Sequence, residues 1–364
     1  MNSFAFWCRR RGVSSSENAS ISAKVNVNLW VDRIHERQAA TQAYLDFGLM
    51  LSRSKEKGEE KALPDAAGVP LIGLIGGIAL YCPFRVQEGG FRDLKPLMNK
   101  DTLGAIFNDR CMVSAVSGEH RYLEVKLVND EDSFYLLSCE NLSIYNEGDG
   151  SIVQIDFPRP SVIKETAERI YVRFRLTIDD KAMLIVGNDS RDKVLTSALS
   201  REATIDFRLN DYRTLSDDIR ERIDGEAEDV CRLTSVTIHT LLMAHSSVDV
   251  DSFEELRETR LLEGGDSWKA YAPNGEPKGV VAWHWKKRLD KPNDGYKLYL
   301  KLKIHVCNWG TIALYLLFLA SFSVLTNLAS SALSNSAGMV AALVLSVVVS
   351  ALLLICGYFK SRSS

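Results

Sequence analysis

The chain has 364 residues and a formal net charge of −3, from 44 basic and 47 acidic side chains. Its seven cysteines are odd in number and form no CxxC pair, which argues against a disulfide framework and a zinc ribbon and is typical of a reducing cytosol. The first eleven residues include three arginines but no following apolar stretch, so they do not read as a secretory signal.

Residues 1–65 are predicted to form an N-terminal helical segment, with the helix itself between Asn28 and Lys57. Apolar side chains recur there near helical spacing, at Trp30, Ile34, Leu45 and Leu49.

The next apolar stretch, Gly68 to Cys82, is short for a membrane span, and its proline and glycines weaken a helix. We interpret it as a buried strand and turn; a re-entrant or membrane-lying segment is the alternative.

Further along the chain, apolar and polar residues alternate with a period of two in residues 122–127, 170–178, 203–209 and 297–304. This pattern predicts strands with one wet face, and therefore mostly antiparallel sheets. Helices are expected near Asp93–Phe107 and Leu215–Asp229. The fold class predicted for residues 66–305 is a β-rich α+β cytosolic domain, of which a sandwich is one arrangement.

Two of the expected strands, Gly279–Arg288 and Tyr296–His305, are predicted to form a hairpin around the turn residues Pro292 to Gly295. The second strand would continue with almost no linker into the apolar C-terminal part of the chain.

The C-terminal part, residues 306–359, contains no Asp, Glu, Lys or Arg and is divided by a small polar break. Each half has about twenty residues, enough to cross a bilayer core of roughly 30 Å as a helix. We therefore expect a two-helix transmembrane hairpin, about 307–327 and 338–359, followed by a tail of residues 360–364. Lysines before the first span and Lys360 after the second place both termini in the cytoplasm of an inner-membrane protein.

No catalytic motif, cofactor site or metal site is assigned. The six histidines are dispersed, and neither an HExxH nor a GxSxG sequence occurs. Asp249 and Asp251 resemble a carboxylate pair for Mg²⁺, but we interpret their acidic stretch as the start of a helix. A membrane-tethered hydrolase that uses these two carboxylates remains an alternative.

Two basic features are the candidate ligand-binding residues. Arg173 and Arg175 would share the wet face of one strand, where planar guanidinium groups suit phosphate; pairing with carboxylates of neighbouring strands is the alternative. Lys297, Lys301 and Lys303 lie in a region, Lys278 to His305, with an excess of six positive charges. This region would attract anionic membrane lipid or, with Trp283, Trp285 and Tyr299 interleaved, hold a polyanion.

In the second predicted span, small residues repeat every four positions at Ala342, Ser346 and Ser350. Such a stripe permits close helix packing, either within the hairpin or around a narrow pore built from several copies of the chain.

The order of these parts, a cytosolic domain followed by the apolar pair in residues 306–359, resembles the membrane effectors of bacterial anti-phage systems. In layout it is most similar to the channel-forming effector of Hailong-type defence. The resemblance implies a tetramer-like homo-oligomeric channel, a short DNA oligomer as ligand and a partner nucleotidyltransferase that makes it. No residue of that family can be mapped onto this sequence.

The sequence thus predicts an oligomeric membrane effector, an ion channel or pore gated by a nucleotide, cyclic nucleotide or nucleic-acid oligomer, and acting in antiviral defence. The alternative is a membrane-anchored binding or scaffold protein without conduction.

Overall fold

The computed structural model describes residues 3–12, 21–31, 43–53, 71–116, 119–129, 133–158, 168–178, 184–188, 200–225, 227, 229–262, 266–289, 291, 294–305 and 309–332. Two compact units make up the chain. The first comprises Met1–Asp189 and Arg201–His305, and the second comprises Ser190–Ser200 and Val306–Ser364.

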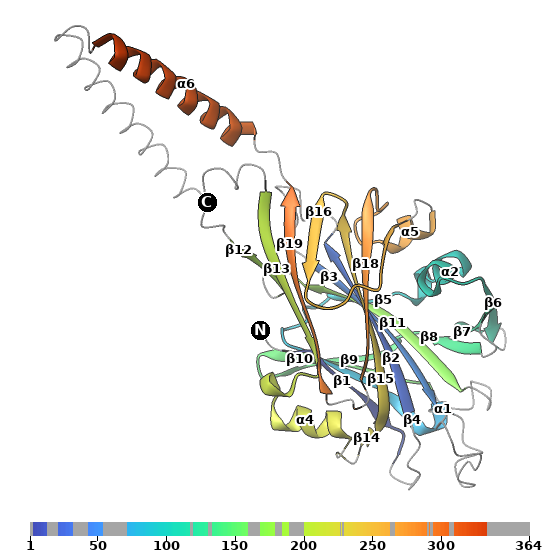
Figure 1. The fold of residues 1–364 in the computed structure, drawn as a ribbon. Coiled ribbons are helices and arrows are strands. Elements are labelled where there is room, and N and C mark those ends of the chain that lie inside the picture. Colours follow the sequence, from blue (N-terminus) through green and yellow to red (C-terminus); the bar gives the residue numbers. More distant parts are fainter. Residues whose placement is uncertain are drawn as a thin grey trace. The chain divides into compact units, whose positions relative to one another are not determined.

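A ten-stranded sheet forms the centre of the first unit (Figure 1). Its order is β17 (Glu258–Leu261), β18 (Val280–Leu289), β15 (Leu233–His245), β2 (Ile21–Val31), β3 (Ala43–Arg53), β11 (Arg169–Ile178), β8 (Ser133–Leu137), β7 (Glu119–Leu127) and β6 (Cys111–Val116), with β5 (Phe91–Asp93) also paired to β11. The pairs β15–β2 and β11–β8 are parallel, whereas the other neighbours in this sheet are antiparallel.

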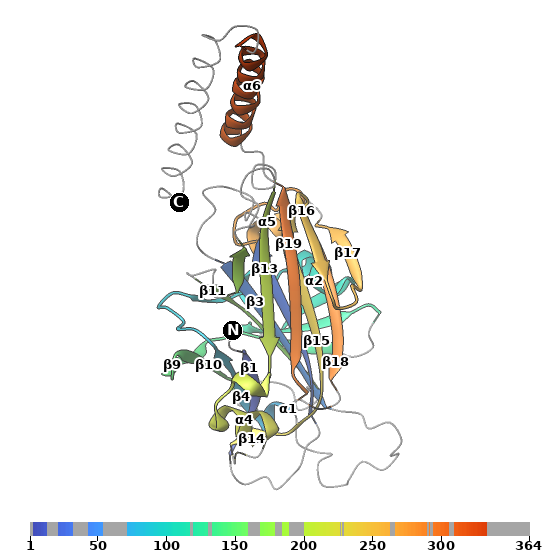
Figure 2. The same cartoon turned by 60° about the vertical axis from the view of Figure 1, so that its left-hand side comes forward.

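A four-stranded sheet packs on one face of the ten-stranded sheet, and the two views show their strands side by side (Figures 1 and 2). Its order is β12 (Ile185–Asn188), β13 (Ser200–Leu209), β19 (Tyr296–His305) and β16 (Val248–Ser252). Between the sheets, the ring of Phe4 contacts Phe47 of β3 at a centroid distance of 5.6 Å and Phe207 of β13 at 5.4 Å. The predicted alternation therefore places one side of each strand in a shared core, as in a sandwich.

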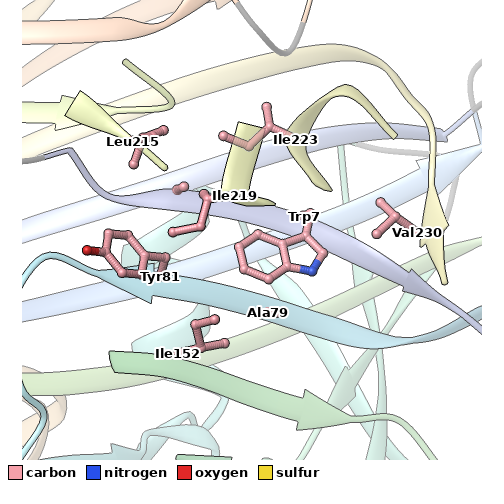
Figure 3. Packing of buried hydrophobic residues seen from close by; sticks show 9 residues of the cluster. Trp7, Ala79, Tyr81, Ile152, Leu215, Ile219, Ile223 and Val230 are labelled. Carbon is pink, nitrogen blue, oxygen red and sulfur yellow. The ribbon is translucent and has the colours of Figure 1, made fainter. Parts of the chain in front are cut away.

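A third sheet has the order β14 (Val230–Cys231), β1 (Ala5–Arg10), β4 (Ile75–Cys82), β10 (Gly150–Asp156) and β9 (Asn141–Glu147). The short helix α1 (Leu71–Leu74) leads into β4, and the 3₁₀ turn η4 (Tyr212–Thr214) precedes the helix α4 (Asp217–Asp224). Figure 3 shows how α4 covers this sheet: Ile219 and Ile223 pack over Trp7 of β1. The spacing of four residues between the two isoleucines is what places both on one helix face.

The opposite face of the ten-stranded sheet, called the outer face from here on, is partly covered by helices. They are η1 (Lys95–Leu97), α2 (Lys100–Phe107) and α5 (Asp266–Tyr271). Phe107 of α2 packs on Tyr171 of β11 at a centroid distance of 5.2 Å, and Tyr271 of α5 packs on Trp30 of β2 at 6.3 Å. These contacts bury side chains that a bare sheet face would leave in water.

The predicted strands are confirmed at residues 122–127, 170–178, 203–209 and 297–304, which lie within β7, β11, β13 and β19. Helices α2 and α4 lie within the two regions where helices were expected. In the described part of the stretch Gly68 to Cys82, the short helix α1 is followed by β4, so the buried strand is confirmed for Ile75–Cys82 only.

The predicted helical N-terminal part is wrong, because β2 and β3 occupy the described residues between Ile21 and Arg53. Leu45, Phe47, Leu49 and Leu51 alternate with a period of two and are all almost fully buried. Leu45 and Leu49 are four residues apart, a spacing that fits one face of a helix and also one face of a strand, so the pattern was misread as helical.

The predicted hairpin of residues 279–305 is also wrong. Both strands exist, but β18 pairs with β15 and β17, whereas β19 pairs with β13 and β16. The turn residues therefore carry the chain from one sheet of the sandwich to the other. The indole N–H of Trp285 in β18 donates to the Ser252 hydroxyl in β16 at 3.1 Å, which links the two sheets directly.

Apart from Ser200 at the start of β13, the described part of the second unit is the helix α6 (Trp309–Ala332). Among the described residues, no helix combines the length and the apolar character that a membrane crossing requires. This finding overturns the predicted transmembrane hairpin, and with it the expected membrane protein, ion channel and multi-pass inner-membrane location. The prediction rested on the absence of charged side chains, a feature that α6 shares with the rest of residues 306–359.

Candidate anion-binding site

Strand β11 brings Arg173 and Arg175 to the outer face, where α5 covers them. Their side chains are 1% and 3% exposed, so the predicted solvated strand face is wrong for both residues. The alternation itself is correct, because Val172 and Phe174 point into the sandwich core. What the alternation could not show is that a helix distant in sequence closes the polar side.

Arg175 forms a buried ion pair with Asp46, its direct cross-strand neighbour on β3. Its Nε donates to Asp46 Oδ1 at 2.6 Å, one Nη2 hydrogen bond reaches Oδ2 at 3.0 Å, and another reaches the Tyr271 carbonyl at 2.9 Å. Asp46 also accepts from the Trp30 indole and the Tyr271 hydroxyl, both at 2.9 Å. This bidentate pair matches the predicted alternative of a neighbouring-strand carboxylate.

Arg173 lies beside this pair without a carboxylate of its own. Its Nε donates to the Tyr271 hydroxyl at 2.5 Å, and its Nη1 donates to the Tyr171 hydroxyl at 2.8 Å. The remaining nitrogen, Nη2, is buried and has no hydrogen-bond partner among the residues that the structure describes. Its guanidinium carbon also lies 5.5 Å from the centre of the Tyr271 ring.

We call Asp46, Tyr171, Arg173, Arg175 and Tyr271 the arginine cluster. The cluster holds two guanidinium groups and one carboxylate, which leaves one net positive charge under α5. Burial alone would lower the pKa of Arg173, but Tyr171, Tyr271 and Asp46 raise it on balance. Burial raises the pKa of the Tyr271 hydroxyl well above its ordinary value, so this group stays neutral. The positive charge is therefore permanent at physiological pH.

Gly48 of β3 makes room for the cluster. It pairs with Arg173 across the strands, and a methyl group added there would overlap the Tyr171 hydroxyl and lie 2.8 Å from Arg173 Nη1. Only a residue without a side chain lets the guanidinium lie across the β3 backbone.

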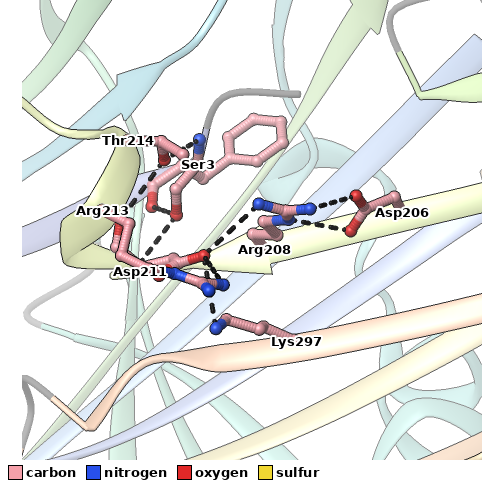
Figure 4. Close-up of polar contacts among 8 residues, drawn as sticks. Ser3, Asp206, Arg208, Asp211, Arg213, Thr214 and Lys297 are labelled. Carbon is pink, nitrogen blue, oxygen red and sulfur yellow. Dashed lines mark hydrogen bonds and ion pairs between the residues drawn. The ribbon is translucent and has the colours of Figure 1, made fainter.

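The lysines of β19 lie on another surface, the solvent side of the four-stranded sheet. Lys297, Lys301 and Lys303 alternate with buried residues, as predicted. The Lys297 ammonium lies 3.5 Å from Asp211 Oδ2, and Asp211 also binds Arg208 and Arg213 (Figure 4). Burial alone would raise the pKa of Asp211, but Arg213 and Lys297 hold it below its ordinary range.

The other two lysines face carboxylates of β16, since Lys301 pairs in register with Asp251 and Lys303 with Asp249. These aspartates lie in a strand and not at a helix start, which corrects the earlier interpretation of the acidic stretch. The excess of positive charge counted along the sequence is therefore opposed by carboxylates from the neighbouring strand. Of the expected stacking residues, Trp285 is buried, whereas Tyr299 is exposed and stacks on Phe253 at 6.1 Å.

The structure does not bring the candidate residues together: the arginines lie on the outer face of the ten-stranded sheet, and the lysines lie on the solvent side of the other sheet. Ala342, Ser346 and Ser350 lie outside the described residues. Asp46, Gly48 and Tyr271 were missed. Asp46 falls within the segment predicted as a helix, although a lone acidic residue within an alternating apolar run is a recognisable signal for a buried partner.

Within the described ranges, no group of three or more His, Cys, Asp or Glu side chains could hold a metal ion. Neither a protein family nor a curated protein matches the sequence.

Several solved structures show a distant likeness. Native leukotriene A4 hydrolase from Saccharomyces cerevisiae aligns at a TM-score of 0.31 and 8% identity, over 80% of this chain and 31% of that one. An M1 zinc metallopeptidase from Deinococcus radiodurans aligns at 0.26 and 10% identity, over 78% of this chain and 42% of that one. The chain spans less than half the length of either structure, and scores this low carry no argument about its fold or activity.

Proposed function

We propose that this protein is a ligand-binding module that holds an anionic group at Arg173, between α5 and the outer face of the ten-stranded sheet. The observation that carries the proposal is the buried guanidinium with one unpartnered nitrogen. An unpaired buried charge is costly, and a bound oxyanion would both neutralise it and accept from Nη2.

The neighbouring Arg175 serves another purpose in this proposal. Its two hydrogen bonds to Asp46 already neutralise it, so it holds β3, β11 and α5 in place. Arg173 is then the binding residue, and Tyr171 and Tyr271 orient its guanidinium group.

A phosphate-bearing molecule is the ligand class that best suits a guanidinium with a free edge. A nucleotide, cyclic nucleotide or nucleic-acid oligomer remains the ligand that the sequence analysis predicts. The homo-oligomer, the partner nucleotidyltransferase and the defence role rest only on the resemblance in layout, and they stay predictions.

The test compares Arg173→Met with Arg175→Met in the full chain. Binding of inorganic phosphate, a cyclic dinucleotide and a short DNA oligomer is measured by calorimetry, and the free energy of unfolding is measured in urea. Arg173→Met should weaken binding of the active ligand about 30-fold or more, since a hydrogen bond to a charged group contributes about 2 kcal/mol. Its stability should change little, because an uncompensated charge is removed.

The control variant, Arg175→Met, leaves Asp46 buried without its ion pair. It should lose about 3–5 kcal/mol of stability. Unchanged ligand binding by a folded Arg173→Met protein, or binding of none of the three probes by the natural chain, would contradict the proposal.

A further inference from the structure

A second polar group lies elsewhere on the outer face, on the neighbouring strands β15 and β18. His239 of β15 and His284 of β18 are half-buried, and their rings stack at a centroid distance of 5.2 Å. His239 Nδ1 and His284 Nε2 are 3.0 Å apart and share one hydrogen bond. We call these two residues the histidine pair.

Positive side chains surround the histidine pair. Lys286 lies directly across from His239 on β18, and Lys24 of β2 lies one pair along the same face. The backbone of Arg257 binds the His284 carbonyl at 2.9 Å, and Arg260 follows in β17. Glu258 pairs with His284 in register, and its carboxylate acts on the pair against these cations.

This charge distribution disfavours a metal cation and favours an anion. Burial, the imidazole of His284 and the nearby cations lower the pKa of His239 to about 4. Burial and Arg257 likewise lower the pKa of His284, against the opposite effect of Glu258. The pair is therefore neutral at pH 7, in a ring of four cations and one carboxylate.

The hydrogen bond inside the pair determines what the outer nitrogens can do. One imidazole donates to the other, so in the neutral pair one outer nitrogen carries a hydrogen and the other carries a lone pair, whichever tautomer is present. The outer nitrogens, His239 Nε2 and His284 Nδ1, have no hydrogen-bond partner in the described part of the chain. Addition of one proton converts both outer nitrogens into donors.

We propose that the histidine pair, with Lys24, Lys286 and Arg257, is a second anion site that binds a tetrahedral oxyanion with uptake of one proton. The proton goes to the outer nitrogen that carries the lone pair, and no covalent bond to the anion forms. The site is separate from Arg173 and does not depend on the function proposed above. His239 pairs in register with Asn26, Asn26 with Gly48, and Gly48 with Arg173. His239 and Arg173 are therefore three strand spacings apart, or about 14 Å.

The sign of the pH dependence follows from linkage. A bound anion raises the pKa of the pair, so binding strengthens as the pH falls through the pKa of the bound state. It stops strengthening below the pKa of the free state, about 4 for His239. Uptake of a single proton limits the change to about tenfold in affinity per pH unit.

The experiment titrates the full chain with sodium sulfate, whose charge does not change over this range, at pH 7.5, 6.5 and 5.5 and constant ionic strength. Calorimetry in two buffers of different ionisation enthalpy counts the protons taken up by the natural chain. We expect sulfate to bind more tightly at each lower pH, by up to about tenfold per unit, with uptake that approaches one proton.

His239→Gln and His284→Gln should each remove most of this slope, because glutamine hydrogen-bonds but does not titrate. Lys286→Gln should weaken binding at every pH and leave the slope. The matched control is His245→Gln on the same strand, since His245 contacts Ser247 and lies outside the pair. Arg173→Met distinguishes the two sites, because it should not alter the pH dependence of sulfate affinity.

Sulfate affinity that is independent of pH in the natural chain would overturn the proposal. So would a slope that survives in a folded His284→Gln protein, since it would then reflect the rising charge of the whole chain. Failure of the Arg173 experiment would leave this site unaffected.

Discussion

At the scale of single residues, the outer face shows that a polar side chain in an alternating strand need not meet water. Arg173 and Arg175 occupy equivalent strand positions two residues apart, and both are buried. They differ only in what stands opposite them: Asp46 pairs with Arg175, and Gly48 pairs with Arg173. One arginine is neutralised and stabilises the fold, whereas the other lies over a residue without a side chain and keeps an unused donor.

Gly48→Ala tests this arrangement. The new methyl group would overlap the Tyr171 hydroxyl and press on Arg173 Nη1, so we expect a loss of about 1–3 kcal/mol in the free energy of unfolding, measured in urea. In a Tyr171→Phe background the overlap with the hydroxyl is gone, and the same substitution should be less harmful. Equal losses in both backgrounds would show that the hydroxyl does not define the space above Gly48.

Among the elements, the paired strands β15 and β18 hold His239, whose imidazole can take up a proton, against His284. The pKa of His239 falls from its ordinary 6.5 to about 4 in the folded chain, because burial disfavours the imidazolium and cations surround it. The unfolded chain therefore binds a proton more readily than the folded chain between these values.

The stability that the neutral His239 contributes is fully present above pH 6.5 and declines as the pH falls from there to about 4. Urea unfolding at pH 7.5, 6.0 and 4.5 in sulfate-free buffer should show this decline. His239→Gln should reduce it, and saturating sulfate should oppose it in the natural chain. A decline of the same size in the His239→Gln protein would assign the effect to other groups.

In the molecule as a whole, the strands of the three sheets in the first unit supply most of the buried apolar side chains among the described residues. Its core includes the stack from Phe4 to Phe47 and the cover of α4 over Trp7. Because none of the buried apolar side chains described in the structure belongs to α6, we expect a chain that ends at His305 to fold by itself.

Comparison of the full chain with one that ends at His305 tests this expectation. Both should melt cooperatively, and both should bind the same anions with the same affinity. Light scattering of the two proteins also examines the predicted homo-oligomer, since assembly through residues after His305 would be lost in the shorter chain. A shorter chain without cooperative unfolding would show that the sheets depend on the second unit.

From the sequence alone, the alternating strands β7, β11, β13 and β19 could be located, and so could the regions of α2 and α4. Alternation depends only on the geometry of a strand, so it can be recognised without knowledge of the neighbours. The charge-free composition of residues 306–359 was equally visible, but the absence of charge alone did not establish a membrane span.

The pairing of the strands and the burial of their polar faces became visible in the folded chain and not in the sequence. Strands β18 and β19 have the spacing of a hairpin and yet enter different sheets, because pairing is settled by the core that each strand helps to fill. The partners of the arginines come from β3 and α5, and the partners of the lysines come from β16 and from Asp211. Charge neutralisation and burial depend on these contacts between segments far apart in the chain, and no local pattern records them.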